Sequence, residues 1–206
     1  MQKPKDRPIL EAVLESAEVI ADTIMRGDAL AEIPFIGTAI KICRAGDSIR
    51  DQAFASKLLR FLSALDAVPE QMKERVKDKV ATSPEEAKKV GETLFFVLER
   101  VTDLDKPTLL AQLFVAYVDA VISADELRRL AQAVDASFAD DLQALLKVAK
   151  PPEKSDEPWM QFLAHTGLTQ VVAGETWDDI GHIYYQVSPL GNKLRNAYFH
   201  GRKKHG

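Results

Sequence analysis

Four side chains near the carboxyl end of the sequence are of the types that bind metal ions or transfer protons: His165, Asp178, Asp179 and His182. Imidazole nitrogens and carboxylate oxygens are common metal ligands and general acids or bases. Their spacing matches no ligand motif, and two adjacent aspartates point in different directions on a helix or strand. We therefore expect no catalytic residue and no metal site, with His165 at a helix end and His182 at the start of a strand.

The single thiol of the sequence belongs to Cys43, which lies close to Lys41 and Arg44. Nearby cations favour the reactive thiolate, but no histidine is near in the sequence to activate it as a nucleophile. One cysteine cannot form an intramolecular disulfide. The sequence therefore predicts a buried structural thiol, and a reducing cytoplasm is the simplest location.

Nucleotide binding and acid-pair catalysis are not indicated either. Gly27, Gly37 and Gly46 are too far apart to form a phosphate-binding loop, and no Gly-Lys-Ser or Gly-Lys-Thr follows them. Asp140 and Asp141 are adjacent, so they do not form a carboxylate pair, and we expect both to be solvated. We predict no cofactor and no enzymatic activity.

The composition is that of a globular protein that can build its own core. Of 206 residues, 46% are hydrophobic and 28% are charged, with a net charge of −4. This balance excludes collagen-like and mostly disordered chains. The first ten residues lack the apolar core of a secretory signal, and the apolar stretch 33–40 is too short to cross a bilayer as a helix.

Helices are the elements that must position these side chains. Apolar residues recur at spacings of three and four, which is typical of amphipathic helices. Five predicted helices cover 8–26, 70–80, 84–101, 107–121 and 124–136. Another begins at a cap formed by Asp47 or Ser48 and ends at Pro69, and one more follows Ser137. Ser83 with Glu86 and Ser123 with Glu126 are predicted capping boxes, and Ser137 is a predicted cap.

The predicted secondary structure changes from helices alone to a mixture of helices and strands after the polar, proline-rich stretch 151–158, which is a possible linker. A short helix over 159–166 is followed by two predicted strands, 168–172 and 182–187, and a last helix begins at Ser188-Pro189. The predicted fold class is mainly α, a multi-helix bundle with a small C-terminal β-hairpin module. We expect an N-terminal helical region over 1–104 and a second region over 105–206.

The ending Tyr185-Gln186-Val187-Ser188-Pro189-Leu190-Gly191 resembles the closing half of a winged-helix domain. Alternation places Tyr185 and Val187 on one face of the strand, Ser188 caps the next helix, and Gly191 admits close packing. The two helices from 107 to 136 and the one that follows Ser137 would supply the first half. With the segment Ile33-Pro34-x-x-Gly37, the chain also resembles small uncharacterised bacterial proteins found beside phage-defence genes, which supply no catalytic residues.

A winged helix implies DNA binding, but the charges disfavour it here. Between Ser155 and Asn192 the sequence has five acids and no Lys or Arg, whereas phosphate contacts and base reading depend largely on cations. Only the C-terminal segment after Asn192 is basic. The candidate nucleic-acid contacts are Lys193, Arg195, Arg202, Lys203 and Lys204.

Two regions have residues suited to contact a protein or a membrane surface. In the first region, apolar side chains lie around Pro34 and Gly37, which interrupt the helical pattern. They precede a predicted helix whose apolar face is flanked by basic residues. Such a helix could bind in a partner's groove, lie on an anionic membrane surface or form a buried helical hairpin. Aromatic side chains, Phe162 and Tyr185 among them, gather near the C-terminus as interface anchors or core. The candidate interaction residues are Phe35, Ile36, Ile40, Arg50, Lys57, Arg60, Trp159, Trp177 and Tyr184.

The leading hypothesis is a non-enzymatic protein-interaction or regulatory module of a bacterial cytoplasmic protein, acting in phage defence through a protein partner or self-association. One alternative is a DNA-binding winged-helix regulator that uses its basic tail. Another is a membrane-surface effector that uses the segment around Phe35.

Overall fold

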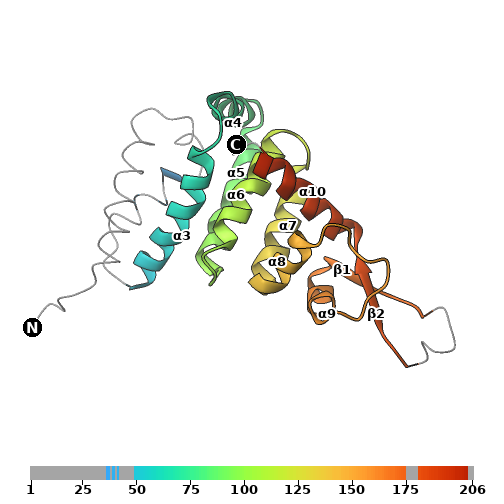
Figure 1. Cartoon of the computed structure of the whole chain (residues 1–206). Coiled ribbons are helices and arrows are strands. Elements are labelled where there is room, and N and C mark those ends of the chain that lie inside the picture. Colours follow the sequence, from blue (N-terminus) through green and yellow to red (C-terminus); the bar gives the residue numbers. More distant parts are fainter. Residues whose placement is uncertain (1–35, 38, 40, 42–48, 175–180, 204–206) are drawn as a thin grey trace, which may run out of the picture. The chain divides into compact units, whose positions relative to one another are not determined.

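A computed structural model describes residues 36, 37, 39, 41, 49–174 and 181–203 of the chain (Figure 1). These residues form a mainly α structure with one small antiparallel hairpin near the C-terminus, which confirms the predicted fold class. The predicted helix over 8–26 and Cys43 lie outside the described residues. The elements are α3 (Ile49–Asp66), α4 (Glu70–Thr82), α5 (Pro84–Arg100), α6 (Lys106–Val118), α7 (Ala124–Ala136), α8 (Ala139–Lys147), α9 (Pro158–Leu163), the 3-10 helix η2 (Ala164–Thr166), β1 (Thr169–Val172), β2 (Tyr184–Val187) and α10 (Pro189–Lys203).

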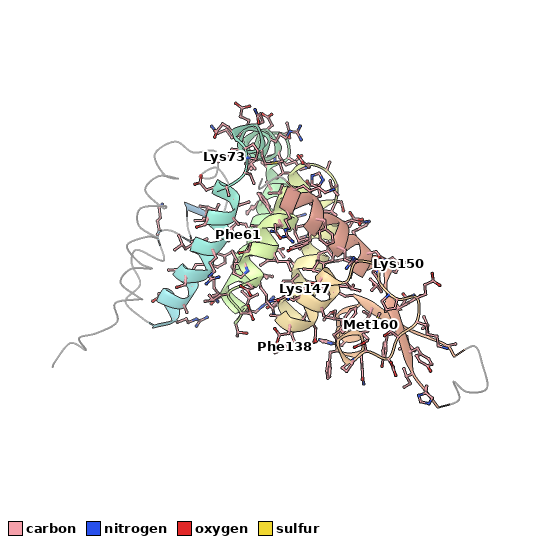
Figure 2. All side chains as sticks on the ribbon, viewed as in Figure 1. Phe61, Lys73, Phe138, Lys147, Lys150 and Met160 are labelled. Atoms are coloured by element: carbon pink, nitrogen blue, oxygen red, sulfur yellow. The ribbon has the colours of Figure 1, made fainter. Side chains whose placement is uncertain are left out.

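The chain divides into two compact units, and the boundary falls inside α6, between Ala111 and Gln112. In unit 1, the largest fully buried side chains of the core include four from α3 and α5. Phe61, Leu65, Leu94 and Leu98 are fully buried, and Phe61 is labelled on α3 in Figure 2. These side chains recur at three- and four-residue spacings, so each helix turns one apolar face inward.

In unit 2, helix α10 packs closely on two other backbone segments. Gly191 lies against Leu168 and Val187, and Gly201 lies against the backbone of Gln112 in α6. A side chain at either position would occupy the space of those atoms. The predicted close approach at Gly191 is therefore confirmed.

The hairpin has a register in which Thr169 pairs with Val187 and Val171 pairs with Tyr185. Tyr185 also forms an isolated antiparallel bridge with Ser155, through hydrogen bonds of 2.7 and 3.0 Å. Because one edge of β2 faces β1 and the other faces Ser155, part of the stretch 151–158 is held beside the hairpin.

The predicted helix caps are confirmed at two serines and wrong at two others. Ser123 forms the complete capping box with Glu126, and Ser188 Oγ accepts a hydrogen bond from Gly191 N. Ser83 precedes α5 but makes no side-chain capping bond. Ser137 does not cap α8, since its hydroxyl donates to Ala133 O at 2.6 Å and Phe138 occupies the cap position.

Among the described residues, no helix combines the length and the apolar character needed to span a membrane.

Candidate protein-interaction surface

The N-terminal candidate residues that the structure describes all lie in unit 1. Ile36 is fully buried. Lys57 is buried and donates to Glu99 O at 2.5 Å and Val101 O at 3.0 Å, at the C-terminal end of α5. Helix C-termini expose unpaired carbonyl groups and favour cations, so the Lys57 ammonium completes the end of that helix.

The other two candidate cations of this region also contact acids within unit 1. Arg50 pairs with Glu99, and Arg60 Nη1 lies 3.8 Å from Asp105 Oδ1. The cations that flank the apolar face of α3 therefore meet α5 and the loop that follows it. Phe35 and Ile40 lie outside the described residues.

The basic residues of α10 divide into engaged and exposed side chains. Arg195 is buried and donates to Leu145 O, to Val148 O at 2.6 Å and to Ala149 O at 3.4 Å. Lys193 donates to Glu126 Oε1 of the α7 capping box. Arg202 and Lys203 are exposed, and Lys204 lies outside the described residues. Two of the predicted nucleic-acid contacts thus hold α10 onto α7 and α8.

The Lys193–Glu126 pair makes stability depend on pH. The hydrogen bond from Lys193 and the bond to the Ser123 backbone hold the pKa of the Glu126 carboxyl below its ordinary value. A lowered carboxyl pKa stabilises the fold at pH values above the ordinary value, and this stabilisation is lost as the pH falls through the lowered pKa.

We therefore expect Glu126→Gln to lower the free energy of unfolding by about 1 kcal/mol at neutral pH. The deficit should shrink in acid, where wild-type Glu126 becomes protonated. Urea unfolding across neutral and acidic pH measures this, with E153Q as the exposed control. A deficit that stays constant with pH would contradict the assignment.

Of the four side chains considered as a metal or acid–base cluster, the structure describes the two histidines. His165 Nε2 lies 3.2 Å from Ala136 O and its Nδ1 lies at hydrogen-bond distance from Phe162 O. His182 is exposed and stacks on Tyr184 with 6.1 Å between ring centres. Asp178 and Asp179 lie outside the described residues. Within the described part of the chain, no group of three or more His, Cys, Asp or Glu is placed to hold a metal ion.

The aromatic candidates of unit 2 have different surroundings. Tyr184 is half-buried on the outer face of the hairpin, with Lys154 Nζ 4.2 Å from its ring centre. Trp159 is also half-buried, and Tyr185 is buried. Trp177 lies outside the described residues. Of the aromatic side chains near the C-terminus noted from the sequence and described by the structure, Phe162 is the most exposed, at 58%.

Phe162 belongs to a set of exposed apolar side chains that come from contacting elements of unit 2. Phe138 is 67% exposed, Val171 62% and Ile183 60%. They come from the start of α8, from α9, from β1 and from the residue before β2. We call these four side chains the exposed apolar surface. Val121, which is also exposed, lies in the turn after α6 and is not included.

The short α9 explains why the described elements of unit 2 leave these side chains exposed. Pro158 begins the helix, and Gly167 in the left-handed region (φ 76°) ends the 3-10 turn after it. Six helical residues span only about 9 Å. Thr169 Oγ1 donates to Met160 O at 2.5 Å, so α9 packs on the inner face of the hairpin at Thr169.

Further along that face, Val171 and Ile183 extend beyond the region that α9 covers. Strand side chains alternate between faces, so Val171 follows Thr169 and Ile183 precedes Tyr185 on the inner face. Thr169 and Tyr185 are buried, whereas Val171 and Ile183 are exposed. Figure 1 shows α9 beside the two strands, and Figure 2 labels Met160 on α9.

His165 places Phe138 and Phe162 near each other. Its two ring nitrogens contact the carbonyl groups of Ala136 and Phe162, so one imidazole spans the end of α7 and the end of α9. Phe138 follows Ala136 by two residues and marks the start of α8, whose last residue is Lys147 (Figure 2). The backbone segments that carry the two exposed phenylalanines therefore lie side by side.

Acidic groups border this surface. Asp140 and Asp141 are in the first turn of α8, and the exposed Asp156 and Glu157 precede α9. Burial raises the pKa of the Asp141 carboxyl and Asp140 raises it further, while His165 opposes the shift. The prediction that both aspartates are simply solvated is wrong for Asp141, which is partly buried.

Comparison with models of known protein families, with curated proteins and with solved structures finds no significant match to this chain.

Sequence reasoning missed three members of the exposed apolar surface. Phe138 falls within the helical segment predicted after Ser137 but occupies the cap position of α8, with its side chain 67% exposed. Val171 and Ile183 lie in the two predicted strands, 168–172 and 182–187, and the strand pattern alone does not show that they are exposed. A signal was present for them, because a helix limited by Pro158 and Gly167 is too short to cover a hairpin.

Proposed function

We propose that this chain is a non-enzymatic protein-interaction module of the bacterial cytoplasm that binds another polypeptide through the exposed apolar surface of unit 2. The observation that carries the proposal is the exposure of Phe138, Phe162, Val171 and Ile183 on neighbouring segments. Apolar side chains gathered in this way mark interaction sites more often than single exposed residues do. Aromatic side chains also make effective anchors at interface centres.

The chemistry of α9 supports a protein partner over DNA. The bridge at Ser155, then α9, then β1 and β2 follow an order that supports a winged-helix-like description of this end. In such a domain the helix before the hairpin enters the DNA groove. The α9 sequence PWMQFL has no Lys or Arg, and aspartate and glutamate precede it, so a phosphate backbone would be repelled. The resemblance to proteins beside phage-defence genes supports a regulatory role there.

Site-specific cross-linking tests the proposed function. Phe162→p-benzoylphenylalanine places a photoreactive group on the exposed apolar surface, and Phe96→p-benzoylphenylalanine places it on the equally exposed Phe96 of unit 1. We expect irradiation in the native cells to give a protease-sensitive adduct of defined mass from position 162 and none from position 96. Mass spectrometry then identifies the partner.

A second variant shows whether the adduct depends on the surface. Val171→Asp in the chain labelled at 162 should abolish the adduct, because it adds a carboxylate to the inner face of the hairpin. Equal adducts from 162 and 96, or adducts sensitive to nuclease or containing only lipid, would overturn the proposal. The last two outcomes would instead favour the DNA-binding or membrane-surface alternatives.

A further inference from the structure

The exposed apolar surface also constrains the chemistry of what binds it. Phe138 lies at the start of α8, Phe162 lies on α9, and Val171 and Ile183 lie on the inner face of the hairpin rather than along the edge of β1. A partner strand added to that edge would satisfy backbone groups but leave Val171 and Ile183 uncovered. A helix laid over the inner face, beside the short α9, would cover them.

A helix that fits here needs its own apolar stripe. The exposed apolar surface consists of large side chains, and helical side chains at i, i+3, i+4 and i+7 form a stripe that can pack against such a surface. Helix α9 covers the part of the inner face at Thr169. The partner helix would lie on the other part of that face, at Val171 and Ile183. An amphipathic helix therefore completes the layer that α9 begins.

The charges around the surface indicate whether the partner helix is basic or acidic. Asp140, Asp156 and Glu157 are exposed beside it, and Asp141 is partly buried. His165 contacts two backbone carbonyl groups, and the Lys154 ammonium lies over the Tyr184 ring on the outer face. From Ser155 to Asn192 the sequence adds no Lys or Arg. Cations on a partner would pair with this acidic border, and anions would be repelled.

We propose that the exposed apolar surface of unit 2 binds a basic amphipathic helix of another protein, with its apolar stripe on Phe162, Val171 and Ile183 and its lysines or arginines against the acidic border. This inference rests on the proposed function and specifies the partner. The chain's own α10 is basic, but Leu194 and Ala197 on its apolar face are fully buried within unit 2. A separate polypeptide is therefore the occupant that the charges and the packing support.

Two synthetic peptides test the proposal on the full chain. Both have the same leucine stripe over about four helical turns, and all other positions are lysine in one and glutamate in the other. We expect fluorescence anisotropy to show saturable binding of the lysine peptide, weakened by salt, and no binding of the glutamate peptide. The variant Phe162→Gln with Val171→Thr should lower the affinity at least about tenfold.

Matched variants separate the surface from general attraction between charges. Phe96→Gln removes an equally exposed phenylalanine in unit 1 and should leave the affinity unchanged. Asp140→Asn with Glu157→Gln should reduce both the affinity and its salt dependence. All these positions are exposed, and circular dichroism checks that each variant is folded.

Three results would overturn the inference: equal binding of both peptides, binding of neither, or lysine-peptide binding that is unaffected by the Phe162 and Val171 changes. A failure of this kind is distinguishable from failure of the proposed function. The cross-linking experiment from Phe162 reports on any polypeptide partner, whatever its charge or secondary structure.

Discussion

Gly191→Ala is expected to destabilise unit 2 by about 3 kcal/mol or more, because a methyl group has no space at this position. A Cβ there would overlap Leu168 O and lie 2.8 Å from Val187 Cγ1. Alanine favours helix over glycine by about 1 kcal/mol, so the helical gain is smaller than the steric cost.

The start of α10 cannot move away without losing other interactions. Ser188 Oγ accepts from Gly191 N at 3.0 Å and donates to Gly167 O at 2.5 Å, and Ser188 N donates to Leu168 O at 3.0 Å. These bonds join the helix to the backbone between η2 and β1. Relief of the overlap would therefore break the cap that begins α10.

Urea unfolding measures the expected loss, with Asn192→Ala as the control. Asn192 is the next residue of the same helix and is exposed, so its replacement should be neutral or slightly stabilising. Because Val187 is the last residue of β2 and Leu168 directly precedes β1, G191A should also weaken lysine-peptide binding. A G191A variant as stable as wild type would contradict the close packing described here.

The helical content and the hairpin could be predicted from the sequence because they depend on local patterns. The apolar stripe of α5 and the Ser123 capping box need only neighbouring residues to form. The start of α10 could be predicted in the same way. Ser188 caps the helix, Pro189 is its first residue, and Gly191 has no side chain and allows close packing.

The failed capping box at Ser83 shows where local patterns become insufficient. Ser83 is also the residue at which α4 ends, and its N–H donates to Lys79 O at 3.1 Å. It adopts φ −139° and ψ 61°, whereas Ser123 has the extended backbone of a helix cap (φ −77°, ψ 169°). Glu86 pairs with Lys79 Nζ at 3.0 Å. A single residue between two helices cannot adopt both end conformations at once.

The candidate sites were harder to predict because their charges and exposures depend on distant partners. The sequence shows that Lys57 and Lys193 are basic, but not that the first caps α5 or that the second meets a glutamate 67 residues away. Exposure of Val171 depends on how far α9 reaches across the hairpin. Neither property follows from residue type or spacing alone.

Arg195→Leu is expected to destabilise unit 2 by about 2–4 kcal/mol, because it removes the guanidinium hydrogen bonds to the end of α8. The guanidinium donates to the carbonyl groups of Leu145, Val148 and Ala149, which a helix C-terminus leaves without intrahelical partners. Burial lowers the pKa of the Arg195 guanidinium, but arginine remains protonated throughout the physiological range. Leucine keeps much of the apolar bulk and isolates the loss of the hydrogen bonds.

Two further variants of α10 distinguish this structural role from contact with nucleic acid. Arg202→Leu removes an exposed cation from the last turn of the same helix and should change the free energy of unfolding by less than about 0.5 kcal/mol. Arg195→Lys should fall between wild type and R195L, because one ammonium cannot reproduce the planar fork that reaches separate carbonyl groups. Thermal and urea unfolding of the three variants measure the order. If R195L were as stable as R202L, the guanidinium would not hold α10 to α8, and its charge would be free to contact phosphate.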